Sequence, residues 1–502
     1  MPGQPLGAAL KELRAQVAEL RAANARLREV IEAKDAQLAV TQAALAAAEA
    51  RFSALSERVD ELERRLGKDS STSSRPPSSD SPYKKKPTDR SLRQRGGRRP
   101  GKQPGAESST LRQVSDPDEM VVCAPSRCEG CGGSLAGAAA VGVQRLQEFD
   151  IVRPPPPRVT EYHVQAKMCG RCGVVTARQP PAGITGRAQY GPEMHAQAAN
   201  LASAHHVPVG RAAELMSAMT GVTVSSGWMA GVRGKAAARL QPFMQRTRDL
   251  LRAAGVIYAD ETPARAAGGL HYVHVACTEY LTCMHTGGRS AADIDAGGVL
   301  PGYAGTIVRD GYAGYAHLAD ALHAWCAAHN LRDLRDLYIF DPAGQVWARS
   351  MADLLIHANA AATAARAAGQ HHLDEATLAQ IRAWYRGAVA KGIADNQGKR
   401  RQATRDGLRL ARRFRDHPDM ILRFVTDLAV GFTSNQAERD IRPVKVQQRT
   451  SGGCWRTLAG LADFSVVQSY LSTAAKWGIS KLDALRQLFT TGPWLPPAIA
   501  PP

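Results

Sequence analysis

Two carboxylates in the sequence each follow a run of apolar, strand-forming residues. Asp260 comes after residues 256–259 and is followed by Glu261, and Asp310 comes after residues 306–309. Such runs predict buried strands that end in an acid. Because an unpaired buried carboxylate is unstable, each acid needs a salt bridge, a helix N-terminus to cap, or a metal ion. The first strand alone leaves these three explanations open for Asp260.

Several further strands surround these two acids in the predicted fold. Pro263 should end the first strand, since proline has no N–H to donate to a sheet, and this strand is therefore expected at residues 256–260. The other predicted strands are 271–278 and 279–286, which form a hairpin, then 306–310, and 322–327. Residues 331–430 are rich in alanine and arginine and should be helical throughout.

A third carboxylate, Glu438, lies on a helix that is predicted to begin near residue 433. Helical spacing places these polar residues on one side of that helix: Asn435, Glu438, Arg439 and Arg442. If the strands before Asp260 and Asp310 are parallel neighbours, both acids emerge at the same edge of the sheet, and Glu438 can complete the set. Oxygen-rich sets of this kind suit two Mg²⁺ or Mn²⁺ ions, which support phosphodiester transfer. For any single acid, a salt bridge or a helix cap is the alternative.

Four of the nine cysteines form two Cys-x-x-Cys pairs. Cys128 and Cys131 make the first pair, and Cys169 and Cys172 make the second. A glycine follows the second cysteine of each pair, as in zinc knuckles, so the sequence predicts one structural Zn²⁺ with four thiolate ligands. A redox pair is the alternative for either motif alone.

Residues 8–66 repeat an apolar side chain every seven residues, from Leu10 to Leu66, over about eight heptads. Asn24 falls at an a position, where a buried asparagine favours a parallel dimer. We therefore expect a leucine-zipper coiled coil that makes the protein a homodimer. A long helix packed against its own chain is the alternative.

The chain carries 64 Lys and Arg against 46 Asp and Glu, a net charge of +18. This excess indicates a polyanionic partner, nucleic acid before membrane. The charge gathers in residues 84–102 and 399–415, although a solvated surface could explain either run alone. Residues 67–115 lack apolar side chains and should be disordered until a partner orders them. With no membrane-length apolar run and no signal-peptide core, we expect a cytoplasmic protein without a membrane partner.

Residues 190–240 have a helical pattern with one short interruption. One helix is predicted at 209–220, a turn at 221–223, and a second helix capped by Ser225 or Ser226. Helix, short glycine turn and capped helix is the outline of a helix-turn-helix, although many helical domains contain such corners.

Three motifs occur in the order typical of one family of mobile-element enzymes. They are Ala259-Asp260-Glu261-Thr262-Pro263, Arg309-Asp310-Gly311-Tyr312-Ala313-Gly314-Tyr315 and Asn435-Gln436-Ala437-Glu438-Arg439-Asp440-Ile441-Arg442-Pro443. Two more precede them, Pro76-Pro77-Ser78-Ser79-Asp80 and Arg99-Pro100-Gly101-Lys102-Gln103-Pro104-Gly105. In combination they closely resemble the transposases of the insertion sequence 66 family, over nearly the whole chain.

The resemblance implies a DDE recombinase with an RNase H-like catalytic fold, in which Asp260, Asp310 and Glu438 hold two Mg²⁺ or Mn²⁺ ions. It also implies cleavage at transposon ends and strand transfer into target DNA. The expected partners are the terminal inverted repeats, target DNA and companion proteins of the same element, in the nucleoid of a bacterial cytoplasm. A transposase-derived regulator that binds DNA without cutting it, or an RNase H-like nuclease, are the alternatives.

The resemblance extends to accessory residues and has two departures. Cys326 and His329 are similar to a Cys-x-x-His element of related transposases, and we assign them an accessory role together with Asn435; a packed thiol and a surface histidine are the alternative. The basic residues usual after that histidine are replaced up to Arg332, and residues 447–453 also differ from the family pattern. Contacts with DNA through charge are expected of Lys84, Lys85, Lys86, Arg98, Arg99, Lys102, Arg439 and Arg442.

A chain of 502 residues is too long for one core, so we expect a multidomain protein. The predicted order is a coiled coil (8–66), a disordered basic linker (67–115), a small zinc-binding module (116–185) and a helical helix-turn-helix DNA-binding domain (186–250). An α/β RNase H-like catalytic core follows in two parts (251–330 and 431–490) around an all-helical insertion (331–430).

Overall fold

The structure, a computed structural model, describes residues 5–67, 111–150, 157–399 and 401–498. Two compact units are present: the first comprises residues 1–84, 190–208 and 230–502, and the second comprises residues 85–189 and 209–229. Six basic side chains expected to contact DNA lie outside the described residues: Lys84, Lys85, Lys86, Arg98, Arg99 and Lys102.

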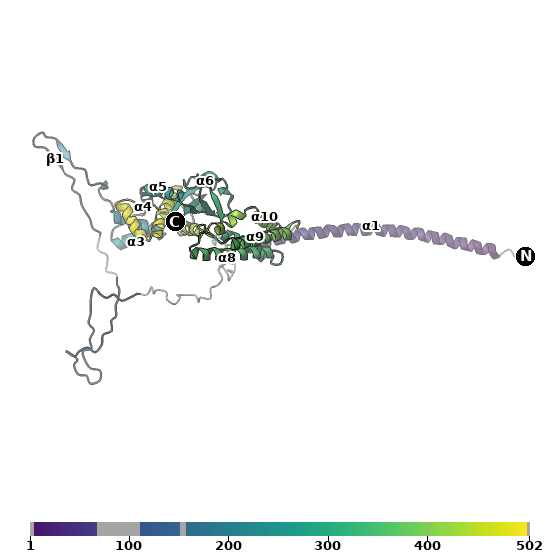
Figure 1. The fold of residues 1–502 in the computed structure, drawn as a ribbon, viewed down its shortest axis with the longest axis horizontal. Helices are drawn as coiled ribbons and strands as arrows, with labels where there is room; N and C mark the ends of the chain where they lie inside the picture. The colour runs from purple at the N-terminus through teal and green to yellow at the C-terminus, as the bar shows by residue number, and fades with distance from the viewer. Residues whose placement is uncertain (1–4, 68–110, 151–156, 400, 499–502) are drawn as a thin grey trace. The chain divides into compact units, whose positions relative to one another are not determined.

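The N-terminal heptads form one continuous helix, α1 (Pro5–Gly67), of 63 residues (Figure 1). Its apolar stripe is exposed in the single chain, at Leu10, Leu13, Val17, Leu20, Leu27, Ile31, Leu38, Leu45, Phe52, Leu55, Val59 and Leu62. The predicted helix and its stripe are therefore present. The dimer that would bury the stripe stays a prediction.

The second unit contains a short hairpin and the predicted helical corner. The antiparallel strands β1 (Ala166–Met168) and β2 (Val175–Ala177) flank the second cysteine pair. Helix α3 (Val209–Thr220) has the predicted bounds, and α4 (Ser226–Arg239) begins in this unit. Gly221 turns the chain with φ +70°, and the Ser225 hydroxyl accepts a hydrogen bond from the Trp228 N–H at 3.2 Å, which caps α4.

The first unit is organised around a five-stranded sheet with the order β5-β4-β3-β6-β7. Its strands are β3 (Val256–Ala266), β4 (Gly269–Cys277), β5 (Thr282–Gly287), β6 (Thr306–Arg309) and β7 (Leu322–Trp325). The first three pair antiparallel, whereas β6 and β7 lie parallel to β3. All the predicted strands are confirmed, with bounds shifted by a few residues.

The prediction that Pro263 ends the first strand is wrong. β3 continues to Ala266, with Pro263 opposite Tyr272 of β4. The parallel partner β6 pairs with β3 only as far as Tyr258, and this edge of β3 is next paired only at Ala266, which bridges to Trp455, so at Pro263 no strand lies beside the edge. A proline is tolerated there because an edge does not require its missing N–H. Asp260 therefore lies inside β3, where the parallel pairing has just ended.

Helices cover the sheet and hold its ends. α13 (Asn435–Thr450) and α14 (Leu458–Lys476) share a hydrophobic core with β3, β4 and β5. Other elements of this unit are α2 (Pro192–Ala199), the π-helix η2 (Asn200–Ala204), α5 (Gln241–Arg252), α6 (Ala291–Asp295), the 3₁₀ helix η3 (Ala313–Tyr315) and α15 (Lys481–Thr490).

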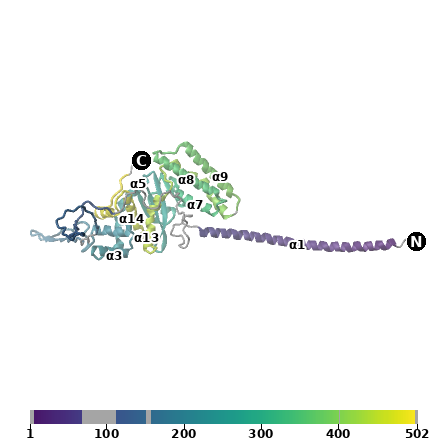
Figure 2. The same cartoon turned by 90° about the horizontal axis from the view of Figure 1, so that it is seen from below.

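Between β7 and α13 the described chain is helical, as predicted. The helices are α7 (Ala327–Phe340), α8 (Val346–Ala367), α9 (Glu375–Asn396), α10 (Gln402–Asp416), α11 (Pro418–Ile421) and α12 (Arg423–Thr426). We call them the helical insertion; α7, α8 and α9 lie side by side in Figure 2. One core joins them to the sheet through Val308 and Ala324. None of the described helices is long and apolar enough to cross a membrane.

Candidate active site

Asp260 and Asp310 lie at the same level of two neighbouring parallel strands. The register of β3 and β6 ends with Tyr258 opposite Val308, and each aspartate comes two residues later. Neighbouring strands are about 4.8 Å apart, and side chains two residues apart point to the same face. The expected parallel arrangement is thus confirmed, and it places both carboxylates on the same face of the sheet where the strands separate.

Backbone hydrogen bonds orient both carboxylates. The Asp260 Oδ1 atom accepts from the Glu261 N–H at 2.8 Å, and the Asp310 Oδ1 atom accepts from the Tyr312 N–H at 2.9 Å. The buried Arg309 guanidinium donates to the carbonyl oxygens of Asp310 (2.8 Å) and Tyr312 (2.9 Å). Arg309 therefore fixes the turn that carries Asp310.

α13 covers the face of β3 to which Asp260 points. Ala264 and Ala266 are an even number of residues from Asp260, so their side chains lie on the same face of β3. Both belong to the core that contains Ala437 of α13. Glu438 is the next residue of α13. Helix packing thus brings the third carboxylate over the same region of the sheet.

The three acids influence one another electrostatically. Burial, which is the largest cause, and the negative charges of Glu261, Glu438 and Asp310 together raise the pKa of Asp260 to about 8, against an opposite effect of His329. A buried carboxylate among like charges favours a bound cation, because a cation stabilises the ionised form.

Asp260, Asp310 and Glu438 lie in the same region, but their carboxylates are not arranged to coordinate a metal ion together. Within the described parts of the chain, no three His, Cys, Asp or Glu side chains are grouped so that they could hold a metal ion. The Glu438 Oε1 atom instead lies 3.8 Å from Nη2 of Arg332, a residue that sequence reasoning left without a role. Three carboxylates nevertheless offer the hard oxygen donors that Mg²⁺ and Mn²⁺ prefer, so the donor chemistry fits these ions.

Asp260→Asn should stabilise the metal-free protein, and by more at pH 8 than at pH 5. The pKa of Asp260 lies above its ordinary value of 3.8, so between these values the folded state holds a proton that the unfolded state has lost. Stability therefore falls as pH rises through this window, and asparagine removes that loss. We expect a gain of roughly 1–3 kcal/mol at pH 8 from denaturant unfolding in chelator. Exposed Asp320→Asn is the control, and an equal gain at both pH values would contradict the expectation.

Glu261 belongs to a network on the opposite face. Its side chain is only 4% exposed and lies 2.7 Å from Arg289, and it accepts from the Tyr315 hydroxyl at 2.9 Å. The Arg289 guanidinium lies over the Tyr312 ring, 3.8 Å from the ring centre. Because the Tyr312 N–H donates to Asp310, this network braces the Asp310 turn. Glu261 thus has a structural role in this network.

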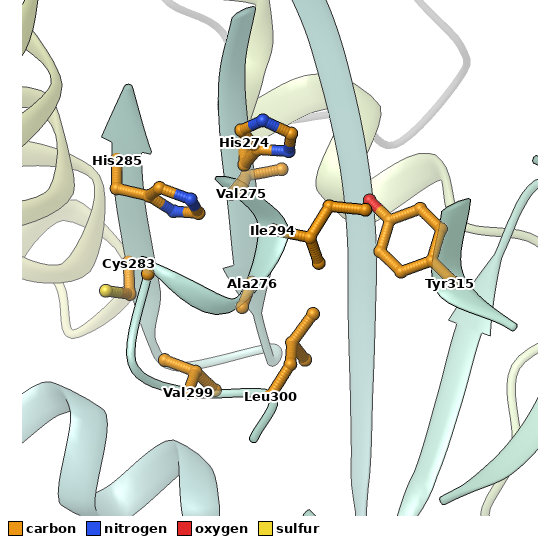
Figure 3. A pocket seen from close by; sticks show the side chains of 10 residues that line it. His274, Val275, Ala276, Cys283, His285, Ile294, Val299, Leu300 and Tyr315 are labelled. Carbon is orange, nitrogen blue, oxygen red and sulfur yellow. The ribbon is translucent and has the colours of Figure 1, made fainter. Parts of the chain in front are cut away.

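A small cavity of about 10 Å³ lies near this network (Figure 3). His274 and His285 stack there on neighbouring strands, with ring centres 4.8 Å apart. Their Nε2–H groups donate to the carbonyl oxygens of Gly288 and Asp293, both at 2.8 Å. Burial lowers the pKa of His285 to about 4, so this ring is neutral at pH 7. The cavity has room for about one water molecule. The two histidine hydrogen bonds hold the loop after β5 in place.

A buried ion pair holds α13 against α14. Asp440 and Lys476 of α14 lie 2.6 Å apart, with side chains 7% and 10% exposed. The Thr282 hydroxyl donates to Asp440 at 3.0 Å, and Lys476 donates to the Thr278 carbonyl oxygen at 2.8 Å. Since Asp440 is two residues beyond Glu438, this network positions the helix that carries the third carboxylate.

Cys326 and His329 lie where α7 meets α13. The buried Cys326 thiol accepts from the Ser434 N–H at 3.2 Å, directly before α13. Burial alone would lower the pKa of His329, but its interaction with Cys326 outweighs burial and raises the pKa to about 9. His329 is half-buried, so it is not a surface histidine. Asn435 is the exposed first residue of α13, near this junction.

Asn435, Arg439 and Arg442 are exposed on the outer side of α13. Glu438 lies on the same side and is half-buried. Ala437 and Asp440 face inward, as do three others. The one-sided arrangement predicted by the helical spacing is confirmed. Contacts of the two arginines with DNA stay a prediction.

The two cysteine pairs form the same kind of turn. The Gly132 N–H donates to the Cys128 carbonyl oxygen at 2.8 Å, and the Gly173 N–H donates to that of Cys169 at 2.9 Å. The two glycines have φ values of +73° and +72°, in the left-handed region. Hydrogen bonds from backbone N–H groups inside each turn lower the pKa values of Cys128 and Cys169. Each turn is thus suited to present thiolates.

The structure does not bring Cys128, Cys131, Cys169 and Cys172 into one group. The described residues between the two pairs also form no strand before β1, which begins at Ala166. Residues 151–156 lie outside the described residues.

Comparison with known families places the site in context. Residues 187–462 match the transposase IS66 family, and this segment contains β3, β6, the helical insertion and α13 with all three acids. Residues 3–112 match a family of unknown function (DUF6444), and this segment includes α1. No curated protein matches the chain.

Proposed function

The chain belongs to the transposase IS66 family, which matches more than half of its length, and we propose that it is a DDE transposase that cuts transposon ends and joins them to target DNA. The observation that supports this most is the placement of Asp260 and Asp310 at one level of parallel strands, with Glu438 on the helix above. Their residue types and shared electrostatics suit phosphodiester chemistry.

The sheet supports an RNase H-like core. The strands β3, β4 and β5 pair antiparallel, and β6 and β7 then follow parallel to β3. The helical insertion separates β7 from α13. We propose that residues 251–330 and 431–490 form this core around residues 331–430, with the zinc module and DNA-binding corner before it.

Asp260, Asp310 and Glu438 would hold the divalent ions. Two bound ions would supply an activated oxygen for attack and stabilise the leaving oxygen at the scissile phosphate. Asp260 would lose its proton when a cation replaces it, and Arg332 would release Glu438 from the ion pair seen here. The chain's own contribution is to position these groups.

Cleavage of defined DNA tests the proposed activity. Full-length protein should nick, and then join, duplexes that carry the DNA flanking its gene, only with Mg²⁺ or Mn²⁺ present. DNA binding without cutting at any ion concentration would instead support a transposase-derived regulator. The ungrouped acids are the observation that favours this second candidate.

We further propose that α3 and the start of α4 act as a helix-turn-helix in DNA binding, beside one structural Zn²⁺. The two matching knuckle turns support the zinc site. Native mass spectrometry should find one zinc per chain in the wild type and none in Cys169→Ser. Cys123→Ser is the matched control, since Cys123 is an exposed thiol outside both turns, and it should keep the metal. A zinc-free wild type prepared without chelator would contradict this proposal.

The exposed stripe of α1 supports a homodimer. Leu20→Glu with Leu27→Glu should convert the dimer to a monomer at micromolar concentration, because charges at d positions cannot be buried in the seam. Ala15→Glu with Ala22→Glu adds the same charge on the outer side and should leave a dimer. Sedimentation velocity distinguishes them, and a monomeric wild type would exclude the coiled-coil dimer.

A further inference from the structure

α10 carries a stripe of arginines that the proposed active site does not use. Together with its N-cap residue it exposes Arg401, Arg405, Arg409, Arg412 and Arg415. Their spacings of four, four, three and three residues follow the helical period, so all five lie on one side. The basic run noted in the sequence is thus a straight, ordered line of positive charge.

The opposite side of α10 fixes this line in place. Its buried residues are Ala403, Thr404, Asp406, Gly407, Leu410, Ala411 and Phe414. A Cβ atom at Gly407 would lie 2.6 Å from the Gln345 side chain, so α10 approaches its neighbours closely. The helix therefore cannot rotate to redirect the arginines, and the stripe is a rigid feature of the helical insertion.

The stripe is unfavourable for the isolated helix. Arginines three and four residues apart on a helix repel one another. Arg409 is paired with the mostly buried Asp406 at 2.8 Å and Arg415 with Asp416 at 2.7 Å, whereas Arg405 donates to the neutral Gln402. A local arrangement that opposes helix stability indicates a partner that compensates it, here a polyanion.

We propose that this stripe binds the phosphate backbone of duplex DNA, an inference that rests on the proposed function. At 1.5 Å per residue, residues 401–415 extend about 21 Å, which corresponds to about six base pairs along a duplex. Arginine is suited to this contact because its planar guanidinium can donate two hydrogen bonds to one phosphate. The contact would be independent of base sequence.

The stripe is braced to the candidate active site. Arg413, beside it on α10, pairs with Asp333 of α7 at 2.7 Å. The preceding residue of α7, Arg332, faces Glu438 of α13 at 3.8 Å. DNA held on α10 would therefore be fixed relative to the helix that carries the third carboxylate.

The salt dependence of DNA binding tests this surface. Full-length Arg405→Gln/Arg412→Gln should bind a random-sequence duplex of roughly 40 base pairs with a log K against log salt slope smaller by about 2, since each phosphate contact contributes about 0.9. The control, Arg382→Gln/Arg386→Gln, removes two exposed arginines from α9 and should keep the wild-type slope. Fluorescence anisotropy without added Mg²⁺ or Mn²⁺ measures binding without cleavage, so failure of the catalytic proposal would leave this result unaffected.

Two further measurements separate DNA contact from damage to the fold. Without DNA, the midpoint temperature of thermal unfolding of the glutamine variant should be at least as high as that of the wild type, because the variant removes repulsion between arginines. Arg405→Lys/Arg412→Lys should restore the slope. An unchanged slope in the glutamine variant, or an equal fall in the α9 control, would overturn the proposal.

Discussion

Asp260→Asn, Asp310→Asn and Glu438→Gln should each reduce strand cleavage by roughly 10³-fold or more while leaving affinity for DNA ends within a few-fold. Each change removes one anionic oxygen ligand at the place where β3, β6 and α13 converge. The other carboxylate that acts on Asp260 is Glu261, which lies on the opposite face and cannot replace the lost ligand. Gel assays of nicking and joining, beside anisotropy measurements of binding, give both quantities.

A control acid makes the loss specific. Asp320→Asn changes an exposed carboxylate of the same unit and should cleave as the wild type does. Wild-type cleavage by any one of the three site variants would remove that residue from the catalytic assignment. Loss of binding together with cleavage would indicate a folding defect instead of a missing ligand.

Lys476→Met should lower the free energy of unfolding by about 3–5 kcal/mol, because it leaves the buried Asp440 carboxylate without its cation. The lysine also donates to the carbonyl oxygens of Thr278 and Leu281, so its loss leaves these acceptors without this donor. Denaturant unfolding followed by tryptophan fluorescence measures the change.

A lysine in an exposed pair provides the comparison. Lys391 lies 3.0 Å from Asp395 with its side chain 55% exposed, so Lys391→Met should cost less than about 1 kcal/mol. Lys476→Met combined with Asp440→Leu should recover part of the loss, since no charge is then left buried. Equal losses for the two lysine variants would show that burial does not strengthen the Asp440 pair.

Local patterns predicted much of the fold. Apolar runs and helical periods are properties of neighbouring residues, so they located the strands around Asp260 and Asp310, the helical insertion and α1. The error at Pro263 has a different origin. Whether proline is tolerated depends on whether a second strand lies beside it, and this was decided by the end of the short strand β6.

The supporting residues of the site could not be predicted in this way. Arg289 meets Glu261 only after β4 and β5 have folded back, and no motif surrounds it. Lys476 reaches Asp440 from a different helix. Arg332 was visible as the basic residue nearest His329, but its proximity to Glu438 depends on how α7 packs beside α13. Such contacts arise from packing between distant segments, which local periodicity does not encode.

The proposed meeting of three carboxylates at divalent ions is tested most directly by diffraction from crystals soaked in Mn²⁺. An anomalous difference map should show a peak in contact with the carboxylates of Asp260 and Asp310 and beside Glu438, and this peak should disappear in Asp260→Asn. Manganese bound elsewhere, with none between the two aspartates, would contradict the proposed active site.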